Sequence, residues 1–233
     1  MKKAIVLVSG GLDSLITVAI AKQENDEIYF LHINYGQRTE QKELDSFREI
    51  VNYYKPIDAK IVNIDYIKDF GGNSLTDIKV DVPINNHIQD LDNSHQVPNT
   101  YVPFRNGNMI GIATAWAEVI NASKIYIGAV EVDGSGYPDC KKSFFEDLEQ
   151  AINSGTKDNF NIQICTPIID MSKSQALQIG QKLGVPFELS WSCYQNNDLA
   201  CGKCDSCYLR IKAFKEARLV DPIPYKVPIN WIN

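Results

Sequence analysis

The expected fold is decided by one segment near the N-terminus, Ala4-Ile5-Val6-Leu7-Val8-Ser9-Gly10-Gly11-Leu12-Asp13-Ser14. Its first five residues are an unbroken aliphatic run, which is typical of a strand buried on both faces of a parallel sheet. Two glycines then permit a tight turn, and residues 13–23 have the pattern of a helix. Because N–H groups at the start of a helix attract anions, we expect a phosphate-binding loop here. The alternative is an ordinary strand-to-helix turn with a Ser or Asp cap.

Strand and helix patterns alternate along the rest of the chain. We expect strands at 28–33, 60–64, 125–130 and 162–165, and helices at 39–54, 109–120, 143–152 and 173–183. Such alternation predicts an α/β domain over residues 1–185, built on a doubly wound, mostly parallel five-stranded sheet. Residues 65–103 interrupt the pattern with Gly71-Gly72, prolines and many Asn and Asp residues, so we expect an irregular active-site flap there.

Four of the six cysteines lie in one C-terminal stretch, within Trp191-Ser192-Cys193-Tyr194 and Cys201-Gly202-Lys203-Cys204-Asp205-Ser206-Cys207. Two overlapping CxxC steps and a fourth cysteine upstream suit a tetrahedral zinc site. Four thiolates leave no open coordination position, which favours a structural role over a catalytic one. Buried thiols, disulfides or an iron–sulfur cluster are the alternatives. We expect residues 186–233, with a helix at 205–217, to form a zinc-binding appendage packed on the first domain, with the ligands Cys193, Cys201, Cys204 and Cys207.

The composition describes an ordinary globular protein and limits the classes of partner. Of the 233 residues 44% are hydrophobic and 22% charged, the formal net charge is −6, and the pI is near 5.1. No basic run indicates a face for phosphates, so a nucleic-acid partner is not expected. No apolar run approaches the ~20 residues of a membrane span, and the N-terminal run is too short for a signal peptide. We expect a cytoplasmic protein, whose cysteines are then kept reduced.

Ser9-Gly10-Gly11-Leu12-Asp13-Ser14 matches the SGGxDS loop of the N-type ATP pyrophosphatases, which the chain therefore resembles. More specifically, nearly the whole chain resembles the 7-cyano-7-deazaguanine synthases of that superfamily. This resemblance is carried, in the expected order, by Tyr35-Gly36-Gln37-Arg38, Val102-Pro103-Phe104-Arg105-Asn106, Ser135-Gly136-Tyr137-Pro138-Asp139-Cys140, Thr166-Pro167 with Ser172-Lys173, and the cysteine motif. The SGYPDC and cysteine motifs discriminate this family from its relatives. Leu15 and Ile16 stand where threonines are expected, a minor departure.

The resemblance implies a homodimeric ligase that uses ATP, Mg²⁺ and ammonia to convert 7-carboxy-7-deazaguanine into 7-cyano-7-deazaguanine, through an adenylated carboxylate and an amide. The residues expected to bind ATP are Leu7, Val8, Ser9, Gly10, Gly11, Leu12, Asp13, Ser14 and Arg38. Those expected to bind the acid substrate are Arg105, Asn106, Asp133, Ser135, Gly136, Tyr137 and Asp139. The expected catalytic residues are Asp13, Lys173 and Arg105.

Several alternatives stay open at this point. Arg105 and Lys173 are each also interpretable as solvated surface cations near the start of a helix. Cys140 is either a reactive thiol or an ordinary loop residue, because reactivity needs an electropositive setting. The competing functions are a tRNA-modifying thiolase or lysidine-type synthetase, a GMP- or NAD-synthetase-like enzyme, and a non-enzymatic zinc-ribbon module.

Overall fold

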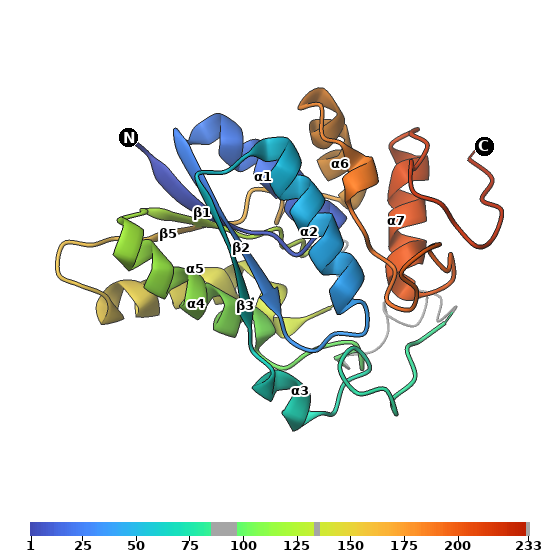
Figure 1. The fold of residues 1–233 in the computed structure, drawn as a ribbon, viewed down its shortest axis with the longest axis horizontal. Coiled ribbons are helices and arrows are strands. Elements are labelled where there is room, and N and C mark those ends of the chain that lie inside the picture. The colour runs from blue at the N-terminus through green and yellow to red at the C-terminus, as the bar shows by residue number, and fades with distance from the viewer. Residues whose placement is uncertain (85–96, 133–135, 232–233) are drawn as a thin grey trace.

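A five-stranded parallel sheet forms the centre of the protein (Figure 1). The computed structural model describes residues 1–84, 97–132 and 136–231. Along the sheet the strands follow the order β3-β2-β1-β4-β5, and every pairing is parallel. Their bounds are β1 (Lys3–Leu7), β2 (Glu27–Asn34), β3 (Asp58–Asn63), β4 (Lys124–Tyr126) and β5 (Gln163–Cys165). The expected five-stranded parallel sheet is confirmed.

Helices cover both faces of this sheet. One face carries α1 (Leu12–Glu24), α2 (Glu40–Tyr54), α6 (Lys173–Lys182) and α7 (Asp205–Glu216). The other carries α3 (Tyr66–Phe70), α4 (Arg105–Ile120) and α5 (Lys142–Gly155). Two short 3₁₀ helices, η2 (Pro138–Cys140) and η3 (Phe187–Leu189), lie in connections. The fold is therefore doubly wound, as expected.

The aliphatic run of β1 supplies both halves of the core. Successive side chains of a strand point to opposite faces. Ala4 and Val6 accordingly pack with α1, α2 and α6, whereas Ile5 and Leu7 pack with α4 and α5. All four are buried. A strand that faces two helical layers has no polar side, and this explains why the run carries no alternation.

The largest differences from the expected elements are at one end of α4, at one end of β4 and in the 65–103 segment. α4 begins at Arg105, four residues earlier than the apolar pattern indicated, and β4 ends at Tyr126 instead of residue 130. The segment after β3 is less irregular than expected, because it contains α3 and a turn built on Asn73. The buried Asn73 Oδ1 accepts hydrogen bonds from two successive backbone N–H groups, those of Leu75 and Thr76. Local side-chain bonds of this kind replace strand or helix pairing.

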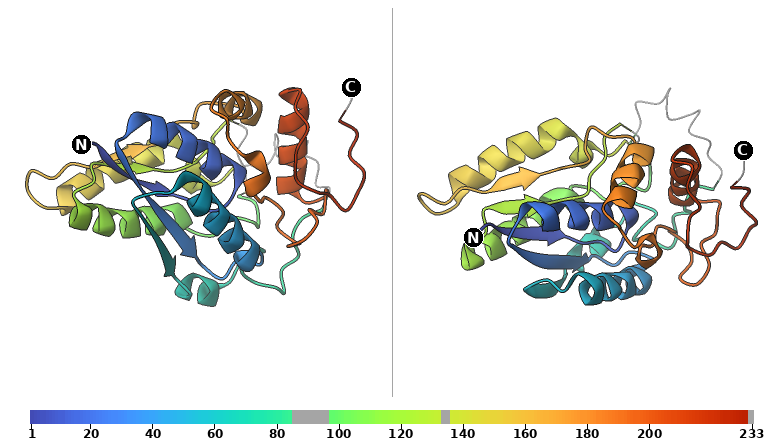
Figure 2. Two further views of the ribbon diagram at one scale, coloured as in Figure 1. Left: turned by 45° about the horizontal axis from the view of Figure 1, so that its top comes forward. Right: turned by 90° about the horizontal axis from the view of Figure 1, so that it is seen from above.

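The C-terminal segment packs at one end of the sheet, where α7 lies beside α6 in both views of Figure 2. Ala213 and Phe214 of α7 belong to the same apolar core as α1 and α6. A smaller third core surrounds the four cysteines and includes Trp191 and Ile223. Among the described residues, the helices are too short or too polar to cross a lipid bilayer.

Candidate functional site

One pocket opens at the carboxyl ends of β1, β2 and β4, where the chain reverses its direction of travel across the sheet. Open α/β sheets bind ligands at this switch point, because the loops after neighbouring strands diverge there. The pocket is lined by the 8–14 loop, the loop after β2, the start of α4, the loop after β4, Lys173 and the segment around Trp191.

The 8–14 loop has the geometry of a phosphate-binding turn. Gly10 has φ +86°, and a Cβ atom there would lie 2.5 Å from the backbone oxygen of Glu43, so only glycine fits. The Ser14 hydroxyl donates to the Gly11 carbonyl at 2.9 Å, and the Ser9 hydroxyl donates to Ser14 Oγ at 3.1 Å. No side chain caps the first turn of α1. Its first N–H groups and the positive end of its dipole therefore face the pocket, where an anion would bind.

A second glycine, Gly128 after β4, allows the 8–14 loop to pack closely against the segment that follows β4. A Cβ atom at Gly128 would lie 2.7 Å from both the carbonyl carbon and oxygen of Asp13 and 2.8 Å from the nitrogen of Ser14. All three are backbone atoms, which cannot rotate away. The start of α1 can therefore approach β4 this closely only over glycine. The sequence analysis did not include Gly128 among the site residues, although a glycine directly after a buried strand is the signal for such an approach.

Two of the expected catalytic residues meet although 160 positions separate them. Lys173 Nζ donates to Asp13 Oδ2 at 2.5 Å, and both side chains are partly buried beside the 8–14 loop. Lys173 is the first residue of α6, whose start is held by a capping box between Ser172 and Gln175. The pair places one cation and one carboxylate next to the N-terminus of α1.

Arg105, the first residue of α4, lies on another side of the pocket. Its Nη1 donates to the Tyr35 hydroxyl at 2.9 Å, and its guanidinium carbon is 5.3 Å from the centre of the Tyr35 ring. Burial raises the pKa of Tyr35 to about 12, so its hydroxyl stays protonated at neutral pH. The preceding residue, Phe104, has a left-handed backbone, and its ring occupies the space that a side chain at position 107 would need. Arg105 is thus positioned by a distorted helix start rather than by a free surface turn.

Other expected substrate residues have different surroundings. Asp139 is buried at 2% exposure; its Oδ2 accepts from the Asn106 backbone N–H at 2.9 Å, and its carbonyl accepts from the Asn106 amide at 2.8 Å. It therefore holds the start of α4 and does not line the pocket, whereas Asn106 and Tyr137 do. Gly136 lies in the same connection with φ +72°. Asp133 and Ser135 lie outside the described residues. The substrate roles of all these residues stay predictions.

Arg38, expected at the ATP, contacts backbone carbonyls of the segment after α3. Its guanidinium donates to Ser74 at 2.7 Å, to Asp77 at 2.9 Å and to Val80 at 2.6 Å. These bonds order the 74–80 segment against the rim of the pocket. These three hydrogen bonds are all to backbone carbonyls, and a contact of Arg38 with ATP stays a prediction.

Glu43 lines the pocket as well, although it is not among the residues predicted from the sequence. One carboxylate oxygen accepts from Gln37 Nε2 at 2.9 Å and the other from Thr39 Oγ1 at 2.8 Å. Burial raises the pKa of Glu43, although these two hydrogen bonds oppose the shift. A Glu in the first turn of a helix is ordinarily a solvent-exposed partner of the helix dipole. Only the packing of α2 under the Gly10 backbone shows that this one faces a pocket.

The four C-terminal cysteines converge on one point. Their sulfur atoms all lie within 4.8 Å of one another, and all four residues are buried. The Sγ atoms of Cys201 and Cys207 are 3.8 Å apart. Tetrahedral zinc with ~2.3 Å zinc–sulfur bonds requires about this sulfur separation. Backbone N–H groups of Gln195, Asn196 and Cys201 point at Cys193 Sγ at 3.3–3.4 Å. The cluster is therefore compatible with a bound metal ion, and Cys140 and Cys165 stand outside it.

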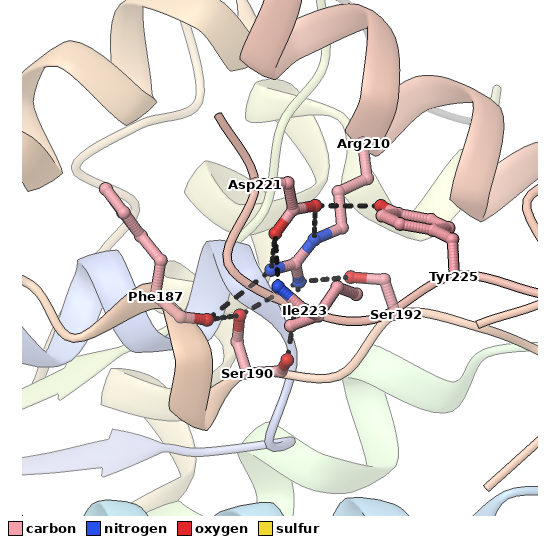
Figure 3. A network of polar contacts seen from close by, with 7 residues as sticks. All are labelled: Phe187, Ser190, Ser192, Arg210, Asp221, Ile223 and Tyr225. Atoms are coloured by element: carbon pink, nitrogen blue, oxygen red, sulfur yellow. Dashed lines mark hydrogen bonds and ion pairs between the residues drawn. The ribbon is translucent and has the colours of Figure 1, made fainter. Parts of the chain in front are cut away.

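A buried ion pair connects the cysteine region to the pocket (Figure 3). Arg210 of α7 donates from Nε and Nη2 to the two oxygens of Asp221, at 2.6 and 2.9 Å, and from Nη1 to the hydroxyl of Ser190 at 2.9 Å. The next residue, Trp191, donates its backbone N–H to the Gly10 carbonyl at 2.8 Å. The phosphate-type loop and the C-terminal segment therefore meet at a backbone hydrogen bond.

Comparison with known proteins gives the family. A family model described as "Queuosine biosynthesis protein QueC" matches residues 3–218. Relatives named 7-cyano-7-deazaguanine synthase include one from Chlorobium chlorochromatii, 48% identical over 99% of both chains, and one from a Sulfurovum species, 48% identical over 97% of this chain and 99% of the relative. Among solved structures, a predicted subunit of a tRNA methyltransferase from Methanocaldococcus jannaschii is 17% identical, with a TM-score of 0.48 over 78% of this chain and 75% of the other. The resemblance inferred from the motifs is confirmed, and the chain belongs to the queuosine biosynthesis protein QueC family.

Proposed function

We propose that the protein is an ATP-dependent ligase that converts 7-carboxy-7-deazaguanine and ammonia into 7-cyano-7-deazaguanine. The reaction would pass through an adenylated carboxylate and then an amide. A second ATP would adenylate the amide oxygen, which would leave with AMP as the amide nitrogen loses its two protons, giving the nitrile. One observation carries the proposal: the Asp13–Lys173 pair lies beside an uncapped helix start at the switch point, with Arg105 on another side of the same pocket. This arrangement offers separate places for a polyphosphate and for a carboxylate.

The loop would hold the phosphates of ATP. N–H groups of residues 12–14 would donate to phosphate oxygens, and Lys173 would offset the negative charge that accumulates as AMP is transferred. Asp13 would hold a magnesium ion, whose positive charge would offset the negative charge of the departing pyrophosphate. The carboxylate of Asp13 fits that role, because one of its oxygens accepts from Lys173 while the side chain stays partly exposed to the pocket.

Arg105 would clamp the carboxylate of the acid substrate. A guanidinium can bind both carboxylate oxygens with parallel N–H donors, and this fixes the orientation in which one oxygen attacks phosphorus. Tyr35 holds the guanidinium through Nη1, and Arg105 belongs to the lining of the pocket. Attack of the carboxylate on the α-phosphorus of ATP releases pyrophosphate and gives a mixed anhydride with AMP, from which ammonia then displaces AMP to form the amide.

The four cysteines would hold zinc in a structural role. With four thiolate ligands the ion has no position left for substrate, so it would stabilise the C-terminal segment rather than take part in the reaction. A homodimer also remains a prediction.

The direct test incubates the purified, zinc-loaded protein with Mg-ATP, an ammonium salt and 7-carboxy-7-deazaguanine, followed by mass spectrometry. We expect the nitrile together with AMP. Amide and AMP without nitrile would limit the protein to the first activation. AMP release only with a different acid would overturn the substrate assignment, and no ATP turnover with any acid would favour a binding module.

The clamp has its own test in Arg105→Lys. Lysine keeps the charge but cannot bind a carboxylate bidentately. Loss of one charge-assisted hydrogen bond, worth ~1.5–3 kcal/mol, should lower kcat/KM for the acid about 10- to 150-fold. The exposed Arg48 on α2 provides the matched control, and Arg48→Lys should behave as the wild type. Equal kinetics for Arg105→Lys and the wild type would remove Arg105 from the site.

A further inference from the structure

Two carboxylates belong to the described lining of the pocket, those of Asp13 and Glu43. Asp13 is paired with Lys173. Glu43 has no Lys, Arg or His nitrogen within ion-pair distance in the described parts of the chain. Of the other cations along the pocket, Arg210 is committed to Asp221 and Arg38 to backbone carbonyls. Arg105 donates to the Tyr35 hydroxyl and acts on Glu43 only from beyond ion-pair distance, lowering the pKa of that carboxyl against the larger effect of burial. Glu43 is therefore the acidic group whose charge the surrounding protein leaves for a ligand.

The carboxylate of Glu43 is held in one orientation. Gln37 Oε1 accepts from the Tyr35 backbone N–H at 3.0 Å, which turns the amide nitrogen of Gln37 toward Glu43. Thr39 holds the second oxygen, and Gln37 and Thr39 are only 5% and 3% exposed. An ionised carboxylate has about four lone-pair sites, two on each oxygen. One site on each oxygen is used here, so one remains on each oxygen.

We infer that Glu43 is the residue that reads the guanine-like edge of the acid substrate, accepting one hydrogen bond from the ring N–H and one from the exocyclic amino group. The inference rests on the proposed function. A guanine-like edge presents two parallel N–H donors, and a carboxylate can accept two such donors, one on each oxygen. The corresponding edge of adenine presents a donor beside an acceptor, so ATP does not match Glu43.

Asp139 is the described acidic residue that the family resemblance assigns to the acid substrate. Asp139 already accepts from the start of α4, and its side chain does not line the pocket. Glu43 and Arg105 instead flank Tyr35, to which Arg105 is hydrogen-bonded directly and Glu43 is connected through Gln37. A ligand with a carboxylate on one side and two N–H donors on the other has complementary partners in this pair.

The test measures binding and turnover for two ligands, 7-carboxy-7-deazaguanine and its analogue without the 2-amino group. Binding is measured by calorimetry in the presence of a non-hydrolysable ATP analogue. Sites built to bond a polar group reject ligands that lack it, because the protein group is left unpaired. We expect the wild type to bind the complete acid about 100-fold more tightly than the analogue.

Glu43→Gln keeps the shape of the side chain but presents an amide N–H₂ to the donors of the ligand. We expect its Kd and KM for the complete acid to rise about 100-fold, with little change for the analogue and with the affinity for the ATP analogue within twofold of the wild type. Glu49→Gln, on an exposed position of the same helix, is the matched control and should change none of these values.

Each outcome decides between the two proposals. If the wild type binds the complete acid more tightly than the analogue but does not turn it over, the proposed reaction is wrong and the role of Glu43 stands. Turnover with equal affinity for both ligands, or a Glu43→Gln variant that loses both ligands alike or loses ATP, would overturn the role of Glu43 and keep the reaction. Failure of the wild type to bind either ligand would overturn both.

Discussion

The phosphate-type loop and the cysteine region meet at one hydrogen bond, but the chain holds them in place by different means. Residues 8–14 depend on close backbone packing, because Gly10 and Gly128 remove the side chains that would keep α1 away from its neighbours. Residues 187–231 are positioned by side chains, through four convergent sulfur atoms and the buried Arg210–Asp221 pair. The loop therefore requires glycine at positions 10 and 128, whereas the cysteine region requires each of its interacting side chains.

Because of this difference, we expect substitutions to affect the two regions differently. A parallel sheet is held by many backbone hydrogen bonds, so no single side chain decides whether the loop forms. The cysteine region is a small satellite core, and removing one partner leaves charges or thiols buried without compensation. Substitutions in the second region should therefore cost more free energy of unfolding, whereas those in the loop should act mainly on ligand affinity.

The largest effect is expected from Cys204→Ser, at a residue with 0% exposure. Loss of a ligand should abolish metal binding and, since metal binding is coupled to folding, lower the free energy of unfolding by more than ~5 kcal/mol. Metal content by mass spectrometry and urea unfolding with and without chelator check this. Cys165→Ser, outside the cluster, should retain the metal and cost less than ~1 kcal/mol. A Cys204→Ser protein of unchanged stability would show that the region does not depend on a metal.

A smaller loss is expected from Asp221→Asn. Asp221 accepts from Arg210, from the Ile223 N–H and from the Tyr225 hydroxyl, so the substitution leaves a buried guanidinium uncompensated. We expect ~3–5 kcal/mol of destabilisation in urea unfolding, with a weaker affinity for ATP. Glu216→Gln breaks the exposed Lys212–Glu216 pair of the same helix and should cost at most ~0.5 kcal/mol. Similar costs for the two variants would contradict the dependence on buried side chains.

Of the three substitutions, Gly128→Ala should lower the free energy of unfolding least. It tests whether a change beside the 8–14 loop acts on ligand affinity more than on stability. The added Cβ meets backbone atoms of Asp13 and Ser14 at 2.7–2.8 Å, so the start of α1 must move. We expect ~1–3 kcal/mol of lost stability, but a much larger fractional loss of ATP affinity, measured by calorimetry. Gly111→Ala, in α4 with no atom within 4 Å of the added Cβ, should instead stabilise the protein by up to ~1 kcal/mol. ATP affinity unchanged by Gly128→Ala would mean that the loop tolerates displacement.

The sheet and the cysteine cluster could be predicted from the sequence because their signals are local. An aliphatic run, a glycine turn and two CxxC steps each lie within a dozen residues. The same logic could not find Glu43, because a Glu in the first turn of an amphipathic helix has the pattern of a surface residue. Asp139 is the opposite case: its motif predicts a substrate contact, which stays a prediction, and the sequence did not indicate that its carboxylate accepts from the backbone of α4. The partners in both cases are distant in sequence, and one chain does not reveal them.

The hydrogen bond from Trp191 to Gly10 also has a consequence for synthesis on the ribosome. β1 and its glycine loop are made first, yet β4, Lys173 and Trp191, which complete the surroundings of the loop, are all made later. At ~5–20 residues per second, translating the roughly 180 residues between Gly10 and Trp191 takes about 10–40 s. A nascent chain therefore carries its 8–14 loop without these neighbours for most of its synthesis, and they are all present only when the last fifth of the protein emerges.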